Sequence, residues 1–285
     1  MWTSARRGSP NTQNAFFFRC QTMNRHARSF AIDGRGIGGE FPPYLIAELS
    51  CNHNGSIDQA FAILEAAKNS GADAVKLQTY TADTMTIQSD RPEFQIKGGL
   101  WDGRTLYDLY EEAHTPWEWH KPIIEKAQEL GLSVFSAPFD VTAVDFLEEL
   151  DVPAYKVASF EIIDIPLIRR IAATGKPVIV STGMATLNEI SEAIEVFREF
   201  GNNQIGVLHC TSGYPTPASD ADLMTIGTLE KIFDVAVGLS DHTLGIGVPV
   251  AAVALGASII EKHLTMDRSD GGLDAASLSN PQNFN

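Results

Sequence analysis

The chain has 285 residues, of which 44% are hydrophobic and 20% are charged, and its formal net charge is −15. This length suits a single β/α barrel of about 250 residues, and the composition is that of an ordinary globular protein. The negative charge argues against a nucleic-acid partner, which needs a basic face. No run of about 20 apolar residues occurs, so we expect no membrane span.

The first 42 residues differ from the rest and are interpreted as an N-terminal extension whose start is disordered. Residues 1–30 carry five arginines and no acidic residue, which is also the composition of a transit peptide. Met23 is an alternative start, in which case residues 1–22 are not translated. The segment 34–39 matches GxGxxG, but no strand precedes it and no helix follows it. We therefore interpret it as a loop and not as a dinucleotide site.

Eight short apolar runs follow Pro43, each rich in Val, Ile and Leu without clean alternation. Such runs are typical of strands that are buried on both faces of a parallel sheet. The predicted strands are residues 44–49, 74–78, 133–137, 154–159, 177–182, 205–210, 236–240 and 259–263.

Amphipathic segments that end at glycine separate these runs. Residues 57–70 place apolar side chains on one stripe, and residues 187–200 begin at a capping box formed by Thr186 and Glu189. Alternating strands and helices imply right-handed crossovers and a parallel sheet. Eight such units predict an α/β fold, a closed (β/α)8 TIM barrel over residues 43–285. An open doubly wound sheet is the alternative.

Two features depart from this regular alternation. Residues 79–115, after the second strand, form a connection long enough to indicate a functional role such as covering a pocket. The chain ends soon after the eighth strand, so we expect the last outer helix of the barrel to be missing.

Polar residues gather at the carboxyl ends of the predicted strands, where a β/α barrel has its active site. They include Glu48, Lys76, Gln78, Lys156, Ser159, Glu161, Ser181, Ser212, Tyr214, Ser240, His242, Glu261 and His263. A buried ammonium is costly unless it is paired, so one such lysine would indicate an ion pair inside the barrel. Several lysines beside several serines better indicate a bound phosphate.

His242 and His263 end the seventh and eighth predicted strands, which are neighbours. Two imidazoles so placed can share a divalent ion and leave positions open for water and substrate. The alternative is that each histidine is only a hydrogen-bonded polar residue. The three cysteines, Cys20, Cys51 and Cys210, form no CxxC pair. They predict neither a disulfide framework nor a zinc site and fit a reduced, cytoplasmic setting.

Motifs at most strand ends resemble the sialic acid synthase family, from about residue 43 to the C-terminus. They are residues 47–56, 71–80, 155–161, 180–186, 238–243 and 261–268. Within that family, residues 96–120 are similar to the pseudaminic acid synthase branch. The resemblance implies a transferase that condenses phosphoenolpyruvate with 2,4-diacetamido-2,4,6-trideoxy-altropyranose, giving pseudaminate and phosphate.

The resemblance also implies roles for individual residues. The group that would bind phosphoenolpyruvate is Lys76, Lys156, Ser159, Ser181 and Ser240. The group that would face the sugar is Gln78, Tyr214 and Asp274, together with Glu48. The group with catalytic roles is Glu48, Gln78 and Glu161. His242 and His263 would bind a divalent cation, which is manganese, magnesium or cobalt.

Relatives in this family are homodimers that continue into a C-terminal antifreeze-like domain, which we expect this chain to lack. Ala137 replaces a hydroxyl residue of many relatives, and Ser212 replaces the asparagine of N-acetylneuraminate synthases. Three alternatives stay open. They are an N-acetylneuraminate synthase acting on N-acetylmannosamine, a Schiff-base aldolase using Lys76, Lys156 or Lys262, and an inactive truncated fragment.

Overall fold

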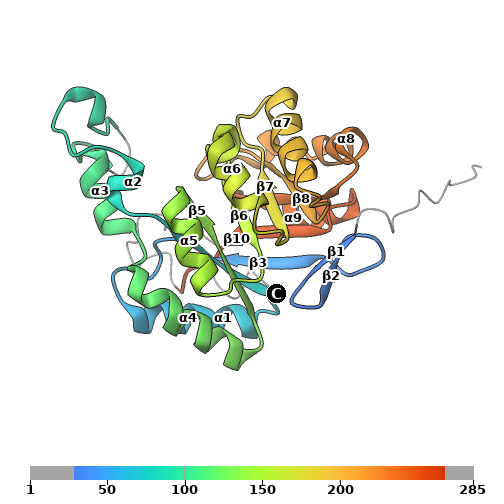
Figure 1. The fold of residues 1–285 in the computed structure, drawn as a ribbon, viewed down its shortest axis with the longest axis horizontal. Coiled ribbons are helices and arrows are strands. Elements are labelled where there is room, and N and C mark those ends of the chain that lie inside the picture. Colours follow the sequence, from blue (N-terminus) through green and yellow to red (C-terminus); the bar gives the residue numbers. More distant parts are fainter. Residues whose placement is uncertain (1–28, 99–100, 267–285) are drawn as a thin grey trace, which may run out of the picture.

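The computed structural model describes residues 29–98 and 101–266, and its centre is a barrel of parallel strands (Figure 1). The strands close in the order β10–β3–β4–β5–β6–β7–β8–β9. They are β3 (Tyr44–Glu48), β4 (Ala74–Thr79), β5 (Ser133–Pro138), β6 (Tyr155–Val157), β7 (Val178–Ser181), β8 (Ile205–Cys210), β9 (Ala236–Asp241) and β10 (Ile259–His263). The predicted closed barrel is confirmed, and the open-sheet alternative is wrong.

Helices cover the outside of the barrel. They are α1 (Ile57–Asn69), α4 (Trp117–Leu130), α5 (Val141–Glu149), α6 (Ile165–Ala172), α7 (Leu187–Glu199), α8 (Met224–Phe233) and α9 (Gly247–Ala254). The capping box predicted for α7 is present: Thr186 N donates to Glu189 at 2.7 Å, and Glu189 N donates to Thr186 Oγ1 at 3.3 Å. Within residues 29–98 and 101–266, no helix has the length and apolarity that a membrane span requires.

A hairpin of β1 (Phe30–Ile32) and β2 (Arg35–Ile37) closes the amino-terminal end of the barrel. Its turn is Asp33–Gly34, both with positive φ, which suits the twist of a two-residue hairpin. The apolar side chains of the hairpin belong to the core cluster inside the barrel. The loop predicted for residues 34–39 is therefore wrong for β2, because the Asp-Gly turn and the buried apolar residues support strand pairing. Residues 1–28 of the predicted extension lie outside the described residues.

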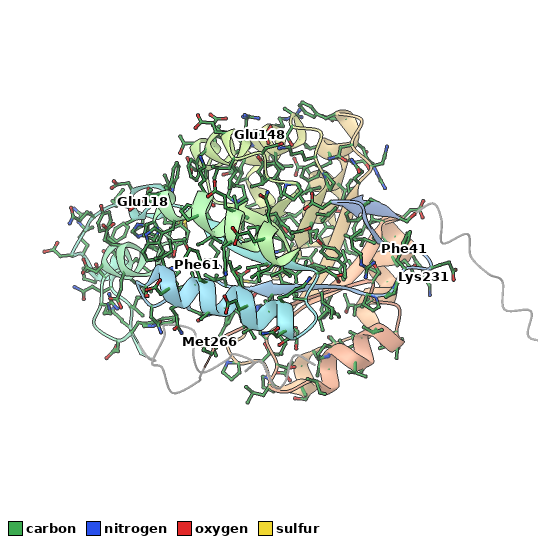
Figure 2. All side chains as sticks on the ribbon, turned by 90° about the horizontal axis from the view of Figure 1, so that it is seen from below. Phe41, Phe61, Glu118, Glu148, Lys231 and Met266 are labelled. Atoms are coloured by element: carbon green, nitrogen blue, oxygen red, sulfur yellow. The ribbon has the colours of Figure 1, made fainter. Side chains whose placement is uncertain are left out.

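The long connection between β4 and α4 forms a projection that we call the arm, residues 80–98 and 101–114. It contains α2 (Ala82–Met85), a 3-10 turn (Pro92–Phe94) and α3 (Leu106–Ala113). Figure 1 shows α2 and α3 at the end of the barrel opposite the hairpin. In Figure 2 the labelled Glu118 marks the arm end, and Phe41 and Lys231 mark the hairpin end. The arm thus stands at the carboxyl ends of the strands.

Candidate active site

Two adjoining cavities lie at the carboxyl end of the barrel. The inner cavity, about 230 Å³, is lined mainly by strand ends. The outer cavity, about 250 Å³, is lined by the arm and by the loop after β3. Five residues line both: Gln78, Tyr80, Tyr110, Tyr214 and His263. One ligand can therefore extend from one cavity into the other.

The inner cavity gathers every predicted substrate-binding, catalytic and metal-binding residue that the structure describes. Lys262, named for the aldolase alternative, does not line it and forms an ion pair with Asp241. The cavity lining includes Glu48, Lys76, Gln78, Lys156, Ser159, Glu161, Ser181, Tyr214, Ser240, His242 and His263. The register of the parallel strands explains this, because Glu48 pairs with Lys76 on one side and with His263 on the other. Paired positions on neighbouring strands lie at one level of the barrel. Asp274, the remaining candidate, lies outside the described residues.

The buried floor of the inner cavity is a four-charge cluster. Lys76 forms an ion pair with Glu48, and its Nζ lies 3.8 Å from Glu261 Oε1. Lys156 Nζ lies 3.7 Å from the same Glu261 oxygen, to which Ser240 Oγ donates at 3.1 Å. Sequence reasoning gave Glu261 no role, although its place two residues before His263 puts both on the same face of β10. The two lysines and two glutamates of the floor consequently balance in charge. Lys76 forms the ion pair inside the barrel that a buried lysine was expected to need.

Burial and neighbouring charges shift the pKa values of this cluster in different directions. Burial and then the neighbouring carboxylate of Glu261 raise the pKa of Glu48 to about 7, against the attraction of Lys76. Burial also holds the pKa of Lys156 below its usual range. For Lys76 burial acts in the same downward direction, but the carboxylates of Glu261 and Glu48 outweigh it and raise the pKa. Glu48 is therefore the carboxylate of this floor that gains a proton near neutral pH.

Hydroxyl groups converge beside Lys156. Lys156 Nζ donates to Ser181 Oγ at 2.6 Å, and Gly183 N donates to Ser159 Oγ at 3.1 Å. A Cβ at Gly183 would lie 2.8 Å from Ser159 Oγ and would also collide with Ser212 Oγ. Any larger residue at position 183 would therefore force these hydroxyls to move. An ammonium with several hydroxyl donors is a suitable site for a phosphate or carboxylate.

The two histidines lie at the mouth of the inner cavity. Their ring centroids are 5.5 Å apart, and the Tyr214 ring lies 4.1 Å from that of His242. His242 Nδ1 lies 3.0 Å from the carbonyl oxygen of Thr211. An Nδ1–H that donates to this carbonyl leaves the Nε2 lone pair for a metal ion.

A divalent cation needs more ligands than two imidazoles supply. Over residues 29–98 and 101–266, no group of three or more His, Cys, Asp or Glu side chains is arranged to hold a metal ion. The donors present fit a cation with two protein ligands whose other positions are taken by water or substrate oxygens. The carbonyl-anchored His242 supports that fit.

Glu161 begins a 3-10 turn (Glu161–Ile163) just after β6. Its Oε2 is buried without a hydrogen-bond partner among the described residues. Burial raises the pKa of Glu161 above its usual range, although Lys156 draws it down. A carboxyl group poised in this way can act as a general acid or base.

The outer cavity is lined by different kinds of residues from the inner cavity. Its walls are Ser50 and Cys51 from the loop after β3, and Trp101, Leu109, Tyr110 and Ala113 from the arm. Tyr80 packs edge-to-face against Tyr110 at 5.9 Å and against Phe139 at 5.3 Å. No Asp, Glu, Lys or Arg is among its described lining residues. This cavity therefore suits an uncharged ligand with apolar parts.

The fold and the site together define a closed β/α barrel with a floor of paired buried charges and a histidine pair at its mouth. Residues 63–285 match the family model described as NeuB, and the chain belongs to the NeuB family.

Individual relatives agree with that assignment. The chain is 52% identical over 226 residues to the pseudaminic acid synthase of Campylobacter jejuni, covering 79% of this chain and 66% of the relative. It is 49% identical over 228 residues to that of Helicobacter pylori, covering 80% of this chain and 67% of the relative. The chain thus spans about two thirds of these relatives.

A solved structure supports the fold. The N-acetylneuraminic acid (sialic acid) synthetase of Leptospira borgpetersenii, in complex with citrate, superposes with a TM-score of 0.82 at 32% identity. The superposition covers 90% of this chain and 85% of that chain.

Proposed function

We propose that this chain carries the active site of a pseudaminic acid synthase. The reaction joins phosphoenolpyruvate to 2,4-diacetamido-2,4,6-trideoxy-altropyranose and releases phosphate. The observation that carries the proposal is the inner cavity, where Lys156 and converging serines lie beside the histidine pair. The 52% identity to a protein named pseudaminic acid synthase supports the choice of sugar.

The floor of the inner cavity is suited to phosphoenolpyruvate. Lys156 and Ser181, with Ser159 and Ser240 nearby, donate to its phosphate and carboxylate. Lys76 adds a second ammonium that stabilises charge as phosphate departs. Because Glu261 and Glu48 balance the two lysines, a proton on Glu48 makes the floor net cationic when the anion binds.

The sugar aldehyde meets carbon 3 of phosphoenolpyruvate at the cavity mouth. Gln78 and Tyr214 orient the sugar, and Asp274 has the same role in the proposal. A manganese, magnesium or cobalt ion held by His242 and His263 would polarise the aldehyde oxygen.

Bond making and bond breaking balance in this reaction. Carbon 3 of phosphoenolpyruvate bonds to the aldehyde carbon with the electron pair of its double bond, which leaves an alkoxide on the sugar and a cation at carbon 2. A water oxygen then adds to carbon 2. Glu161 accepts one water proton, and the carbon–oxygen bond to phosphate then breaks as the remaining hydroxyl proton passes to the departing phosphate and carbon 2 becomes the ketone. Glu48, with its raised pKa, can return a proton to the new alkoxide. The products are the nine-carbon keto acid and phosphate.

Phosphate release and product mass test this proposal. The chain is incubated with phosphoenolpyruvate and manganese, and with the diacetamido sugar, N-acetylmannosamine or no sugar. We expect release only with the diacetamido sugar, accompanied by the mass of pseudaminate. Equal release with N-acetylmannosamine would support an N-acetylneuraminate synthase instead, and no release with either sugar would support an inactive fragment. Unchanged turnover in the double variant His242→Ala, His263→Ala would refute the metal role.

The proposal includes a homodimer, which the family resemblance implies, and a cytoplasmic setting, which the sparse cysteines favour. Light scattering during gel filtration tests the first, with twice the chain mass as the expected result. Fractionation of the source cells tests the second.

A further inference from the structure

We infer that the outer cavity binds the acceptor sugar and that α3 of the arm selects the sugar by its apolar substituents. The inference rests on the proposed function and adds the residues that set substrate choice. Leu109 and Ala113 of α3, with Trp101, form the selecting wall. They belong to the arm and not to the strand ends that carry the chemistry.

The position of the outer cavity supports this assignment. It shares His263 and Gln78 with the inner cavity, so a ligand there reaches the site of bond formation. The inner cavity, about 230 Å³, already contains the anion-binding groups. The adjoining space of about 250 Å³ is available to the second substrate.

The lining of the outer cavity defines the chemistry of its occupant. Its lining combines polar residues, among them Ser50, Gln78 and His263, with the apolar residues Leu109 and Ala113 of α3. A hydroxyl group pressed against these apolar residues would lose its hydrogen bonds to water. A methyl group in the same place gains by leaving water. The cavity thus prefers a sugar whose methyl groups, from a deoxy carbon or an acetamido group, face α3.

The arm is held firmly enough to act as a wall. Trp117 Nε1 donates to the carbonyl oxygen of Tyr80 at 3.2 Å, and Thr79 Oγ1 lies 2.8 Å from His120 Nε2. The first contact fixes the start of the arm, and the second joins the end of β4 to α4. Tyr110 of α3 then packs on Tyr80, which lies against Phe139.

Filling the outer cavity separates this inference from the proposed function. Ala113→Phe adds bulk inside the cavity, and Glu111→Phe adds the same bulk at an exposed position two residues earlier in α3. Binding is measured by titration calorimetry for the diacetamido sugar alone and for phosphoenolpyruvate alone. We expect Ala113→Phe to weaken sugar binding at least tenfold and to leave phosphoenolpyruvate affinity unchanged. Glu111→Phe should change neither.

Three results would overturn the inference. They are sugar affinity equal to wild type in Ala113→Phe, equal weakening of both ligands, and wild-type protein that binds phosphoenolpyruvate but not the sugar. Failure of the proposed function looks different: the wild type binds both ligands as described but releases no phosphate.

A second variant tests the selection itself. Leu109→Ser replaces part of the apolar wall with a hydroxyl group. The affinity for the 6-deoxy sugar, divided by the affinity for its 6-hydroxy counterpart, should fall about fourfold. Burial of one methyl group increases affinity by about this factor. A ratio equal to that of the wild type would overturn the selecting role of Leu109, and phosphoenolpyruvate affinity serves as the internal control.

Discussion

The inner and outer cavities touch each other but are built in opposite ways. The inner cavity has four buried charges within a few ångströms, set by strands whose register leaves little freedom. The outer cavity has no acidic or basic residue other than its histidine among the described lining, and its wall comes from a connection between strands. The difference separates two tasks. In the proposed reaction the strand ends hold the groups that bind phosphoenolpyruvate, and the arm holds those that select the sugar.

Loss of Lys156 should affect the inner cavity most. Lys156→Met removes an ammonium that donates to Ser181 and lies beside the serine hydroxyls. We expect phosphoenolpyruvate affinity to fall about 100-fold, the effect of a lost charge-assisted hydrogen bond and its ion pairing. Sugar affinity should stay within about twofold of wild type. The exposed Lys121→Met is the matched control, and equal phosphoenolpyruvate affinity in both variants would contradict the account.

A low pH should destabilise the protein through two buried histidines at the base of the arm, His53 and His120. Burial lowers the pKa of both His53 and His120 from 6.5 to about 4. Because each folded-state pKa lies below the unfolded value, their contribution to stability is present above pH 6.5 and is lost as the pH falls towards 4. Each histidine should remove about 2 kcal/mol from the free energy of unfolding between pH 7 and pH 5. Urea unfolding at both pH values measures this.

The variant His120→Gln provides the check on that prediction. Between pH 7 and pH 5, its free energy of unfolding should fall by about 2 kcal/mol less than that of the wild type. An identical pH dependence in the two proteins would mean that the pKa of His120 is the same in the folded and unfolded states.

A smaller effect is expected when Gly183, which lies beside Ser159 and Ser212, is substituted. Gly183→Ala forces Ser159 and Ser212 apart, because the added Cβ occupies the space where their hydroxyls meet. Phosphoenolpyruvate affinity should fall about tenfold through poorer hydrogen-bond geometry, and sugar affinity should not change. Gly227→Ala adds a methyl where no atom lies within 4 Å. If that control weakens binding as much, the loss at Gly183 does not come from the serines.

The smallest effect concerns protonation of Glu48. Its pKa of about 7 should rise further beside a bound anion, so binding takes up a proton. Phosphoenolpyruvate affinity should therefore increase a few-fold on acidification from pH 8 to pH 6, relative to Glu48→Gln, which cannot titrate. Parallel pH profiles for the two proteins would rule out this proton uptake. Sugar affinity in the outer cavity should show no such dependence.

Sequence patterns predicted the strands and the inner cavity well for a physical reason. Strands buried on both faces must be apolar throughout, so a polar residue at a strand end is conspicuous. Lys76, Lys156 and His263 were found in this way, and they do line one cavity. Strand β6 is shorter than predicted, since the chain turns into a 3-10 helix at Glu161.

Other features depend on contacts that a sequence pattern does not contain. The roles of Glu261 and Gly183 follow from neighbours distant in the sequence, namely Lys156 and Ser159. The outer cavity depends on how α3 packs over the barrel, which the length of the connection alone cannot specify. The hairpin at Asp33–Gly34 did carry a signal, because Asp-Gly between short apolar runs favours a two-residue turn.

The division between the two cavities is tested most directly by a crystal structure of the chain with phosphoenolpyruvate and the reduced, unreactive diacetamido sugar. We expect the phosphate within hydrogen-bond distance of Lys156 and Ser159. We expect the sugar in the outer cavity, with its methyl groups against Leu109 and Ala113. A sugar bound on the charged floor, or a phosphate bound against α3, would contradict this division.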